Sequence, residues 1–233
     1  MSSFILIPGA GGVAWYWHRV VPLLREVGHE AIAVDLPGDD ESAGLPEYTR
    51  LVTEAIGDCS DVVVVAQSLG GFTAPLVAAA VPVRDIVFVN AMIPVPGETP
   101  GAWWDNTGWA QACEAAARQR GYPTEFDLAV YFLHDVPPDV AAAGEPHQRP
   151  EAEAVFRSVC DFKDWPPVPI RVVAGAFDRF FPLEFQAKVA EQRLNRDLHI
   201  LPGGHLIALA QPVPLAEYLL SVGAEPSQAR RGR

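Results

Sequence analysis

The chain has 233 residues, of which 49% are hydrophobic and 20% are charged, and its formal net charge at pH 7 is −12. This composition is typical of one globular domain with a sizeable core, and so much negative charge would repel phosphate backbones and anionic lipid surfaces. We therefore expect a small-molecule ligand and neither a nucleic-acid nor a membrane partner; a homodimer is compatible with the sequence.

Cysteine usage and hydropathy predict a soluble cytoplasmic protein. Cys59, Cys113 and Cys160 are odd in number and widely spaced, without a C-x-x-C pair, so they predict neither a disulfide framework nor a metal site. The apolar run 4–7 is too short for a secretory signal, and no apolar stretch is long enough to span a bilayer. We expect no metal and no organic cofactor.

Short β-type runs alternate with helical patterns along most of the chain. In chain order, strands are predicted at residues 4–7, 31–34, 62–65, 86–89, 170–174 and 198–201. Apolar spacing predicts helices near residues 17–27, 46–56, 69–80, 183–192 and 207–220. Strands that alternate with helices imply an α/β fold, with a parallel sheet covered by helices on both faces.

One long stretch interrupts this alternation. Residues 94–165 show no strand pattern and instead carry helical patches, many prolines and a group of aromatic residues. The stretch is too long for an ordinary loop. We therefore predict an α/β core from residues 1–93 and 166–222, a helical cap insertion at 94–165, and a disordered polar tail at 223–233.

A nucleophile elbow is predicted where the third strand ends. The sequence Val65-Ala66-Gln67-Ser68-Leu69-Gly70-Gly71 runs from a buried strand through a serine into a helix, with small residues two positions before and after that serine. Such a turn strains the backbone and projects the serine hydroxyl above the sheet. Ala66 replaces the first glycine of the usual G-x-S-x-G pattern. A serine that only caps a helix is the competing interpretation, which the preceding strand disfavours.

Ser68 needs a base to take its proton, and His205 is the best placed of the six histidines. It follows the sixth strand and two glycines, so a loop can carry it over the carboxyl edge of the sheet. Asp178 follows the fifth strand and can fix the tautomer of the imidazole. The chain order serine, aspartate, histidine is the one expected on this fold. Asp35 also ends a strand, but its context indicates a turn residue.

The glycine-rich turn after the first strand predicts part of an oxyanion hole. Its sequence, Pro8-Gly9-Ala10-Gly11-Gly12, can aim a backbone N–H at the negative charge that develops during acyl transfer. The N–H of Leu69, directly after the nucleophile, is the second expected donor. Neither G-x-x-x-x-G-K-[ST] nor G-x-G-x-x-G occurs here, so the turn does not predict a phosphate site.

Up to about residue 222 these motifs resemble the α/β-hydrolase superfamily, and within it the plant-type esterase and hydroxynitrile lyase group. The narrower resemblance rests on residues 8–15, on Gly28-His29, on Phe181-Pro182 with Phe185-Gln186, and on Gly203-Gly204-His205. It implies a mostly parallel six-stranded sheet with the insertion as a lid. It also implies Ser68, Asp178 and His205 as the catalytic triad, with the N–H groups of Ala10 and Leu69 as oxyanion donors.

The sequence departs from the lyases of this group at two positions. The lyases carry a lysine directly after the catalytic histidine and a threonine in the oxyanion loop, where this chain has Leu206 and Gly9. Without the lysine no cation stabilises departing cyanide, so hydrolysis is favoured. Pro8 and Gln67 stand where histidines are more usual, which leaves the triad intact but makes the family a poor guide to the substrate.

The predicted function is hydrolysis of a small carboxylic ester, or of a thioester or lactone, through an acyl-enzyme on Ser68. Two alternatives stay open. One is lyase chemistry on the same triad, and the other is a ligand-binding or signalling protein with an idle triad, because a fold does not fix its function. A haloalkane dehalogenase is disfavoured because it would carry an aspartate in place of Ser68.

Overall fold

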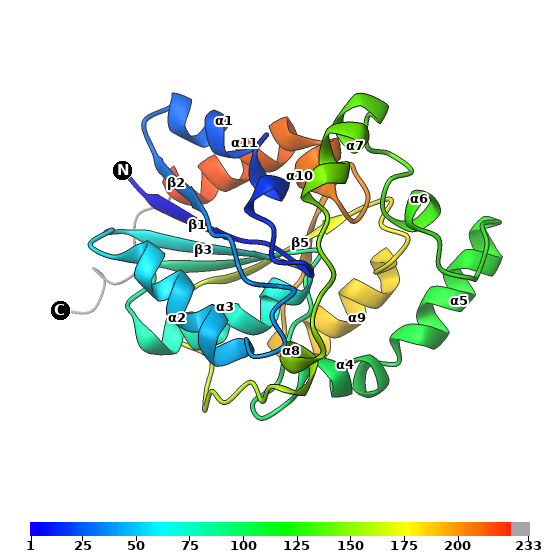
Figure 1. Ribbon diagram of the computed structural model, residues 1–233, viewed down its shortest axis with the longest axis horizontal. Helices are drawn as coiled ribbons and strands as arrows, with labels where there is room; N and C mark the ends of the chain where they lie inside the picture. The colour runs from blue at the N-terminus through cyan, green and yellow to red at the C-terminus, as the bar shows by residue number, and fades with distance from the viewer. Residues whose placement is uncertain (225–233) are drawn as a thin grey trace.

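A parallel sheet organises the computed structural model, which describes residues 1–224 (Figure 1). The sheet has the strand order β2-β1-β3-β4-β5-β6. Its strands are β1 (Ser3–Ile7), β2 (Glu30–Ala33), β3 (Val62–Gln67), β4 (Asp85–Val89), β5 (Ile170–Gly175) and β6 (Leu198–Leu201). Every neighbouring pair is parallel, which confirms the predicted fold class. All six carboxyl ends therefore meet at one edge.

The central strands are apolar on both faces because helices cover both sides of the sheet. β1, β3 and β4 are buried along their whole length, and alternate residues face two separate cores. One core contains Ile5 and Val64 and packs against α2 (Leu45–Ile56), α3 (Thr73–Ala80) and α9 (Leu183–Leu194). The other contains Leu6 and Val65 and packs against α1 (Val21–Glu26) and α11 (Pro212–Ala224).

Prolines divide two of the predicted helices, which is a correction to the sequence analysis. The first becomes a 3₁₀ turn, η1 (Ala14–Trp17), followed by α1, and the last becomes α10 (Ile207–Ala210) followed by α11. Pro22 and Pro212 lie in the first turn of the second member of each pair, because proline lacks the N–H that a helix interior needs. Similarly, the predicted helix 69–80 begins as a 3₁₀ turn, η2 (Ser68–Phe72).

The long insertion lies beyond the carboxyl ends of the strands (Figure 1). Within residues 94–165 the structure has no strand; the helices there are α4 (Pro100–Thr107), α5 (Trp109–Arg120), α6 (Leu128–Tyr131), α7 (Pro138–Gly144), η3 (Glu145–His147) and α8 (Glu153–Arg157). The buried indole of Trp103 joins this segment to the core. Its Nε1 donates to the carbonyl of Ile93 at 3.0 Å, and its ring lies 5.7 Å from that of Phe185 on α9.

The carboxyl end of the described chain is helical. Because α11 continues to Ala224, the predicted tail boundary at residue 223 is two residues too early, and the rest of the predicted tail, 225–233, lies outside the described residues. No helix within residues 1–224 has the length and apolar character needed to cross a bilayer.

Arg84 joins the amino ends of two strands to the last helix, which generates a stability prediction. Its guanidinium contacts Asp85 and Asp61 at 2.7 Å each and donates to the carbonyl of Val222 at 2.9 Å. Of these acceptors Asp85 is buried and Asp61 is exposed, and Asp85 also contacts Arg171 at 3.3 Å. Replacing Arg84 by Met removes the nearer cation from Asp85 and the donor from the Val222 carbonyl. We expect the free energy of unfolding, measured in urea, to fall by about 2–3 kcal/mol.

Arg118 supplies a matched control, since it forms an exposed helical pair with Glu114. Arg118→Met should cost about 0.5 kcal/mol or less. Equal losses in the two variants would contradict the role of the buried cluster.

Candidate active site

The backbone around Ser68 forms a tight elbow between β3 and η2. Ser68 has a φ of 49°, a left-handed conformation that costs energy in any residue with a side chain. Neighbouring backbone leaves no room for a side chain at the second and third positions after it. A Cβ on Gly70 would lie 2.5 Å from the carbonyl oxygen of Pro8, and one on Gly71 would lie 2.0 Å from that of Met92. The small residues that follow the serine are therefore required by the fold.

Three loops bring Ser68, Asp178 and His205 together at the carboxyl edge of the sheet. The Nε2 atom of His205 lies 3.1 Å from the hydroxyl oxygen of Ser68, and its Nδ1 atom lies 2.9 Å from Oδ2 of Asp178. All three side chains are buried. A neutral imidazole that donates from Nδ1 to the aspartate leaves Nε2 free to accept the serine proton.

The carboxylate of Asp178 is held by several donors besides the histidine. Its Oδ1 accepts from the backbone N–H groups of Phe180 and Phe181, at 2.8 Å each. Its Oδ2 accepts from Nε2 of Gln186 on α9, at 3.3 Å. These contacts fix the orientation of the carboxylate, so that it can in turn fix the imidazole.

Asn90 connects the loops that carry the aspartate and the histidine. It directly follows β4 and is fully buried. Its Nδ2 donates to the carbonyls of Gly204 and His205 at 2.9 and 3.1 Å, and its Oδ1 accepts from the N–H of Gly175 at 2.7 Å. Neither Asn90 nor Gln186 had a predicted role, although Gln186 is among the residues on which the family resemblance rests. The signal for Asn90 was its position, a polar residue immediately after a buried strand.

Aromatic rings enclose the imidazole of His205. Phe132, which follows α6 in the insertion, stacks on it with a centroid distance of 4.8 Å and an interplanar angle of 16°. Phe180 and Phe181 approach at 5.1 and 5.0 Å with steeply inclined planes. The imidazole is almost fully buried, and the stacked face could attract an imidazolium if Nε2 took a proton from Ser68.

The turn after β1 passes directly over the elbow. A Cβ added to Gly9 would lie 2.8 Å from Cβ of Ser68, so only glycine permits this approach. Ala10 and Leu69, the predicted oxyanion donors, both line a cavity of about 220 Å³ together with Ser68 and His205.

Asp35 lies away from the triad and accepts from the N–H of Ala14 at 2.9 Å, which fits a turn residue.

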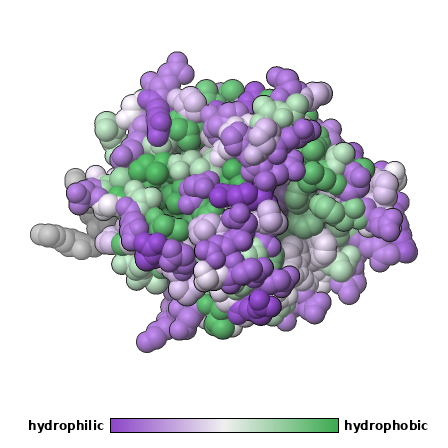
Figure 2. All heavy atoms as spheres, in the orientation of Figure 1, coloured by the Kyte–Doolittle hydropathy of each residue, from purple (hydrophilic) through white to green (hydrophobic). Residues whose placement is uncertain are grey.

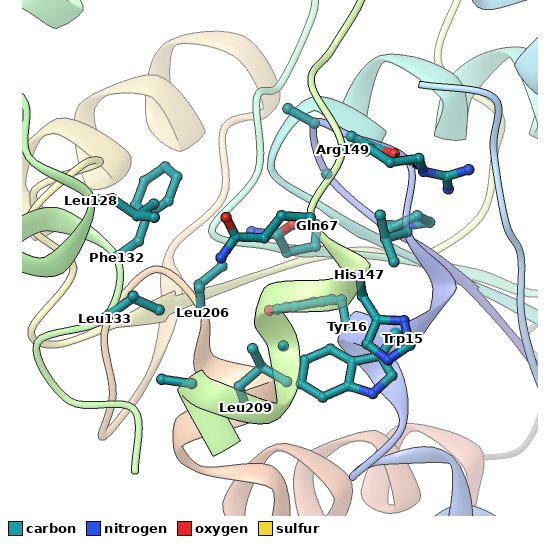
Figure 3. A pocket seen from close by; sticks show the side chains of 18 of the residues that line it. Trp15, Tyr16, Gln67, Leu128, Phe132, Leu133, His147, Arg149, Leu206 and Leu209 are labelled. Carbon is teal, nitrogen blue, oxygen red and sulfur yellow. Dashed lines mark hydrogen bonds between the residues drawn. The ribbon is translucent and has the colours of Figure 1, made fainter. Parts of the chain in front are cut away.

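Two cavities meet at this site. The cavity at Ser68 is lined mainly by apolar side chains, among them Met92, Trp104, Phe156 and Phe180. A second cavity, of about 320 Å³, lies between the turn after β1 and the insertion (Figure 3). In the space-filling view, hydrophobic residues reach the surface in the region where Figure 1 places α6 and α7 (Figure 2).

Comparisons with known proteins place the chain in a family. A model described as the alpha/beta hydrolase family matches residues 4–218. Among curated proteins, "Probable esterase PIR7A" of Oryza sativa subsp. indica is 34% identical over 112 residues, 43% of each chain. "Methylesterase 7" of Arabidopsis thaliana is 36% identical over 106 residues, 40% of this chain and 41% of the relative. Each match thus spans less than half the relative's length.

Solved structures extend the similarity of fold to nearly the whole chain. The crystal structure of polyneuridine aldehyde esterase has a TM-score of 0.80 and 21% sequence identity, and the match covers 96% of this chain and 99% of that one. The structure of the methylesterase MES16 from Arabidopsis has a TM-score of 0.74 at 20% identity, over 96% of this chain and 99% of that one. At these identities the match shows a shared fold.

The contacts of Asn90 generate a second stability prediction. Asn90→Ala leaves the carbonyl of Gly204 and the N–H of Gly175 without the partner that Asn90 provides, and each such buried group costs about 1–3 kcal/mol. We expect the free energy of unfolding in urea to fall by at least about 2 kcal/mol. Gln192→Ala, on the exposed face of α9, serves as the control and should change it by less than about 0.5 kcal/mol. A neutral Asn90→Ala variant would refute the connecting role.

Proposed function

We propose that this chain, which belongs to the alpha/beta hydrolase family, hydrolyses a small carboxylic ester through an acyl-enzyme on Ser68. The observation that carries the proposal is the continuous hydrogen-bond chain from the Ser68 hydroxyl through His205 to Asp178. The esterase and methylesterase relatives support ester chemistry. A thioester or lactone offers the same carbonyl carbon and would react in the same way.

Acylation begins when Ser68 attacks the ester carbonyl and its proton passes to Nε2 of His205. Asp178 stabilises the resulting imidazolium through Nδ1. The N–H groups of Ala10 and Leu69 donate to the carbonyl oxygen as it becomes an oxyanion; removing one such donor typically costs about 10²–10³ in rate. His205 then returns its proton to the departing alkoxide, which leaves as an alcohol.

Deacylation repeats the sequence with water as the nucleophile. His205 takes a proton from water as the hydroxide attacks the acyl carbon, and the same two N–H groups hold the second oxyanion. Collapse of this intermediate breaks the bond to Ser68, which regains its proton from the imidazolium. The products are a carboxylic acid and an alcohol, and no redox step or external reactant besides water is needed.

Leu206 makes the lyase alternative less favourable. Cyanohydrin cleavage on this triad needs a cation beside His205 to stabilise departing cyanide. The apolar side chain of Leu206 occupies that position and lines the Ser68 cavity. The chemistry that fits this environment is the release of an alcohol that His205 itself protonates.

Covalent labelling is the experiment that tests the proposed function. We expect a fluorophosphonate to label Ser68, mapped by mass spectrometry, and p-nitrophenyl acetate and butyrate to be hydrolysed at a steady rate. Ser68→Ala should abolish labelling and lower kcat by at least about 10⁴-fold without lowering Tm. Ser221→Ala, an exposed serine on α11, is the matched control and should keep both properties.

Three results would contradict the proposal. Undiminished turnover by Ser68→Ala would remove Ser68 as the nucleophile. A folded protein with neither label nor turnover would support a binding protein with an idle triad. Release of cyanide from mandelonitrile that depends on Ser68, without ester turnover, would support the lyase alternative.

A further inference from the structure

The second cavity adjoins the catalytic one and shares part of its wall. Ala10, Gln67, Phe132 and Leu206 line both cavities. In Figure 3, Phe132 and Leu206 lie on one side of Gln67, and Trp15 lies on the other. A molecule whose carbonyl carbon sits at Ser68 can therefore extend past Gln67 into the larger space.

The lining of the second cavity is suited to a neutral apolar group. Most of its wall is apolar or aromatic: Val13, Trp15, Tyr16, Leu128, Phe132, Leu133, Val140, Ala141, Leu206 and Leu209. The two charged residues in the wall are engaged with protein groups. Arg149 pairs with Asp35 at 3.0 Å, and Glu151 accepts hydrogen bonds from Gly11 and Tyr48. Arg149 is thus already paired, and Glu151, itself an acid, offers no cation to a substrate carboxylate.

The volume limits what this cavity can hold. An apolar cavity of about 150 Å³ accepts benzene, and this one has about 320 Å³. It therefore has room for a group of about two fused rings or a branched chain of similar size. The 220 Å³ cavity at Ser68 then holds the smaller part of the ester.

We propose that the 320 Å³ cavity is a second substrate subsite that binds a neutral, apolar one- or two-ring group of the ester cleaved at Ser68. This inference rests on the proposed function and refines it: the preferred substrates are uncharged esters with one small and one bulky apolar part. Trp15 and Tyr16 from η1, and Val140 and Ala141 from α7, determine how large the bulky part can be.

The test fills the cavity from α7. Ala141 lines it, whereas Ala142 is the next residue on the same helix and is exposed outside it. In Ala141→Phe, we expect the ratio of kcat/KM for a naphthyl ester to that for p-nitrophenyl acetate to fall at least about tenfold. Ala142→Phe should keep the wild-type ratio. Val140→Phe is the second filling variant if Ala141→Phe is unstable.

Two ester series show which part of the substrate enters the cavity. Naphthyl acetate carries the bulk on the alcohol side, and methyl naphthoate carries it on the acyl side. A selective loss in either series supports the subsite and identifies the part. An unchanged ratio in both series, in a folded Ala141→Phe protein that still turns over acetate, overturns it.

A binding measurement separates this proposal from the proposed function. If the wild-type protein hydrolyses no ester, the proposed function fails, and the subsite is judged by calorimetric binding of 2-naphthol. Binding that weakens in Ala141→Phe and not in Ala142→Phe supports an apolar subsite. Equal binding by all three proteins overturns it.

A separate set of contacts connects the insertion to the oxyanion loop, residues 9–12. Glu151, just before α8, accepts a hydrogen bond from the N–H of Gly11. Arg149 donates from Nε to the carbonyl of Gly11 at 3.1 Å and from Nη2 to that of Gly12 at 3.2 Å. A Cβ on Gly11 would lie 2.7 Å from the carbonyl oxygen of Arg149, so backbone packs against backbone here.

Glu151 is itself fixed at its other oxygen. The Tyr48 hydroxyl on α2 donates to Oε1, and burial raises the pKa of both the Glu151 carboxyl and the Tyr48 phenol. The N–H of Gly11 belongs to the peptide group that joins it to Ala10. Holding that peptide at Glu151 therefore sets the orientation of Ala10, whose own N–H is the proposed oxyanion donor.

We infer that Glu151 and Arg149 are positioning residues for the oxyanion hole. They act on the oxyanion through the backbone of Gly11 and not by direct contact with it. This inference also rests on the proposed function, and its expected signature is a loss in kcat with little change in KM, because the oxyanion interaction strengthens only in the transition state.

Glu151→Ala and Glu151→Gln form the discriminating pair. Glutamine can accept from Gly11 through its oxygen and donate to the Tyr48 oxygen through its amide. We expect Glu151→Ala to lower kcat for p-nitrophenyl acetate at least about tenfold, with KM within about threefold, and Glu151→Gln to restore most of kcat. Arg157→Ala, an exposed cation on α8, should match the wild type.

Hydrogen exchange at the N–H of Gly11 shows whether a loss in kcat comes from a loosened oxyanion loop. Faster exchange of that N–H in Glu151→Ala, together with the loss in kcat, supports the positioning role. Faster exchange with unchanged kcat overturns it, as does a Glu151→Gln variant as impaired as Glu151→Ala. Arg149→Ala is the alternative variant if Glu151→Ala does not fold. A wild-type protein without ester turnover overturns the proposed function and this role together.

Discussion

The close approach of three backbone segments around Ser68 is the constraint on which the rest of the site depends. Gly9 passes over the serine, and Gly70 and Gly71 lie against the carbonyls of Pro8 and Met92 at distances that exclude any side chain. This packing holds Ser68 in a left-handed conformation that an isolated chain would rarely adopt. Because packing at the ends of β1, β3 and β4 maintains this strained conformation, the nucleophile is in place before any substrate binds.

The sheet and the triad could be predicted because each depends on local sequence and on one topological rule. Runs such as the four valines 62–65 identify a strand buried on both faces, and the carboxyl ends of parallel strands share an edge. Ser68, Asp178 and His205 each follow a strand, so the fold class alone brings them near one another. The predicted resemblance to the α/β-hydrolases is confirmed by the family match over residues 4–218.

The supporting residues were not predictable because their partners are remote in the chain. Asn90 contacts Gly175, 85 residues away, and Glu151 contacts Gly11 from a distance of 140 residues. No periodicity or motif connects such positions, since each contact depends on the path of a loop. The helix breaks at Pro22 and Pro212 are a different case. The prolines are visible in the sequence, but the apolar spacing continues across them and predicts unbroken helices.

The insertion contacts the site at the two places where charge develops in the proposed reaction. Phe132 stacks on His205, where positive charge develops, and Glu151 and Arg149 hold the loop at which negative charge develops. Both contacts come from one chain segment, which also forms a wall of each cavity. A displacement of this segment would therefore alter substrate space and charge stabilisation together. Substitutions in residues 94–165 can therefore change the accepted substrate only if they preserve the contacts of Phe132, Glu151 and Arg149.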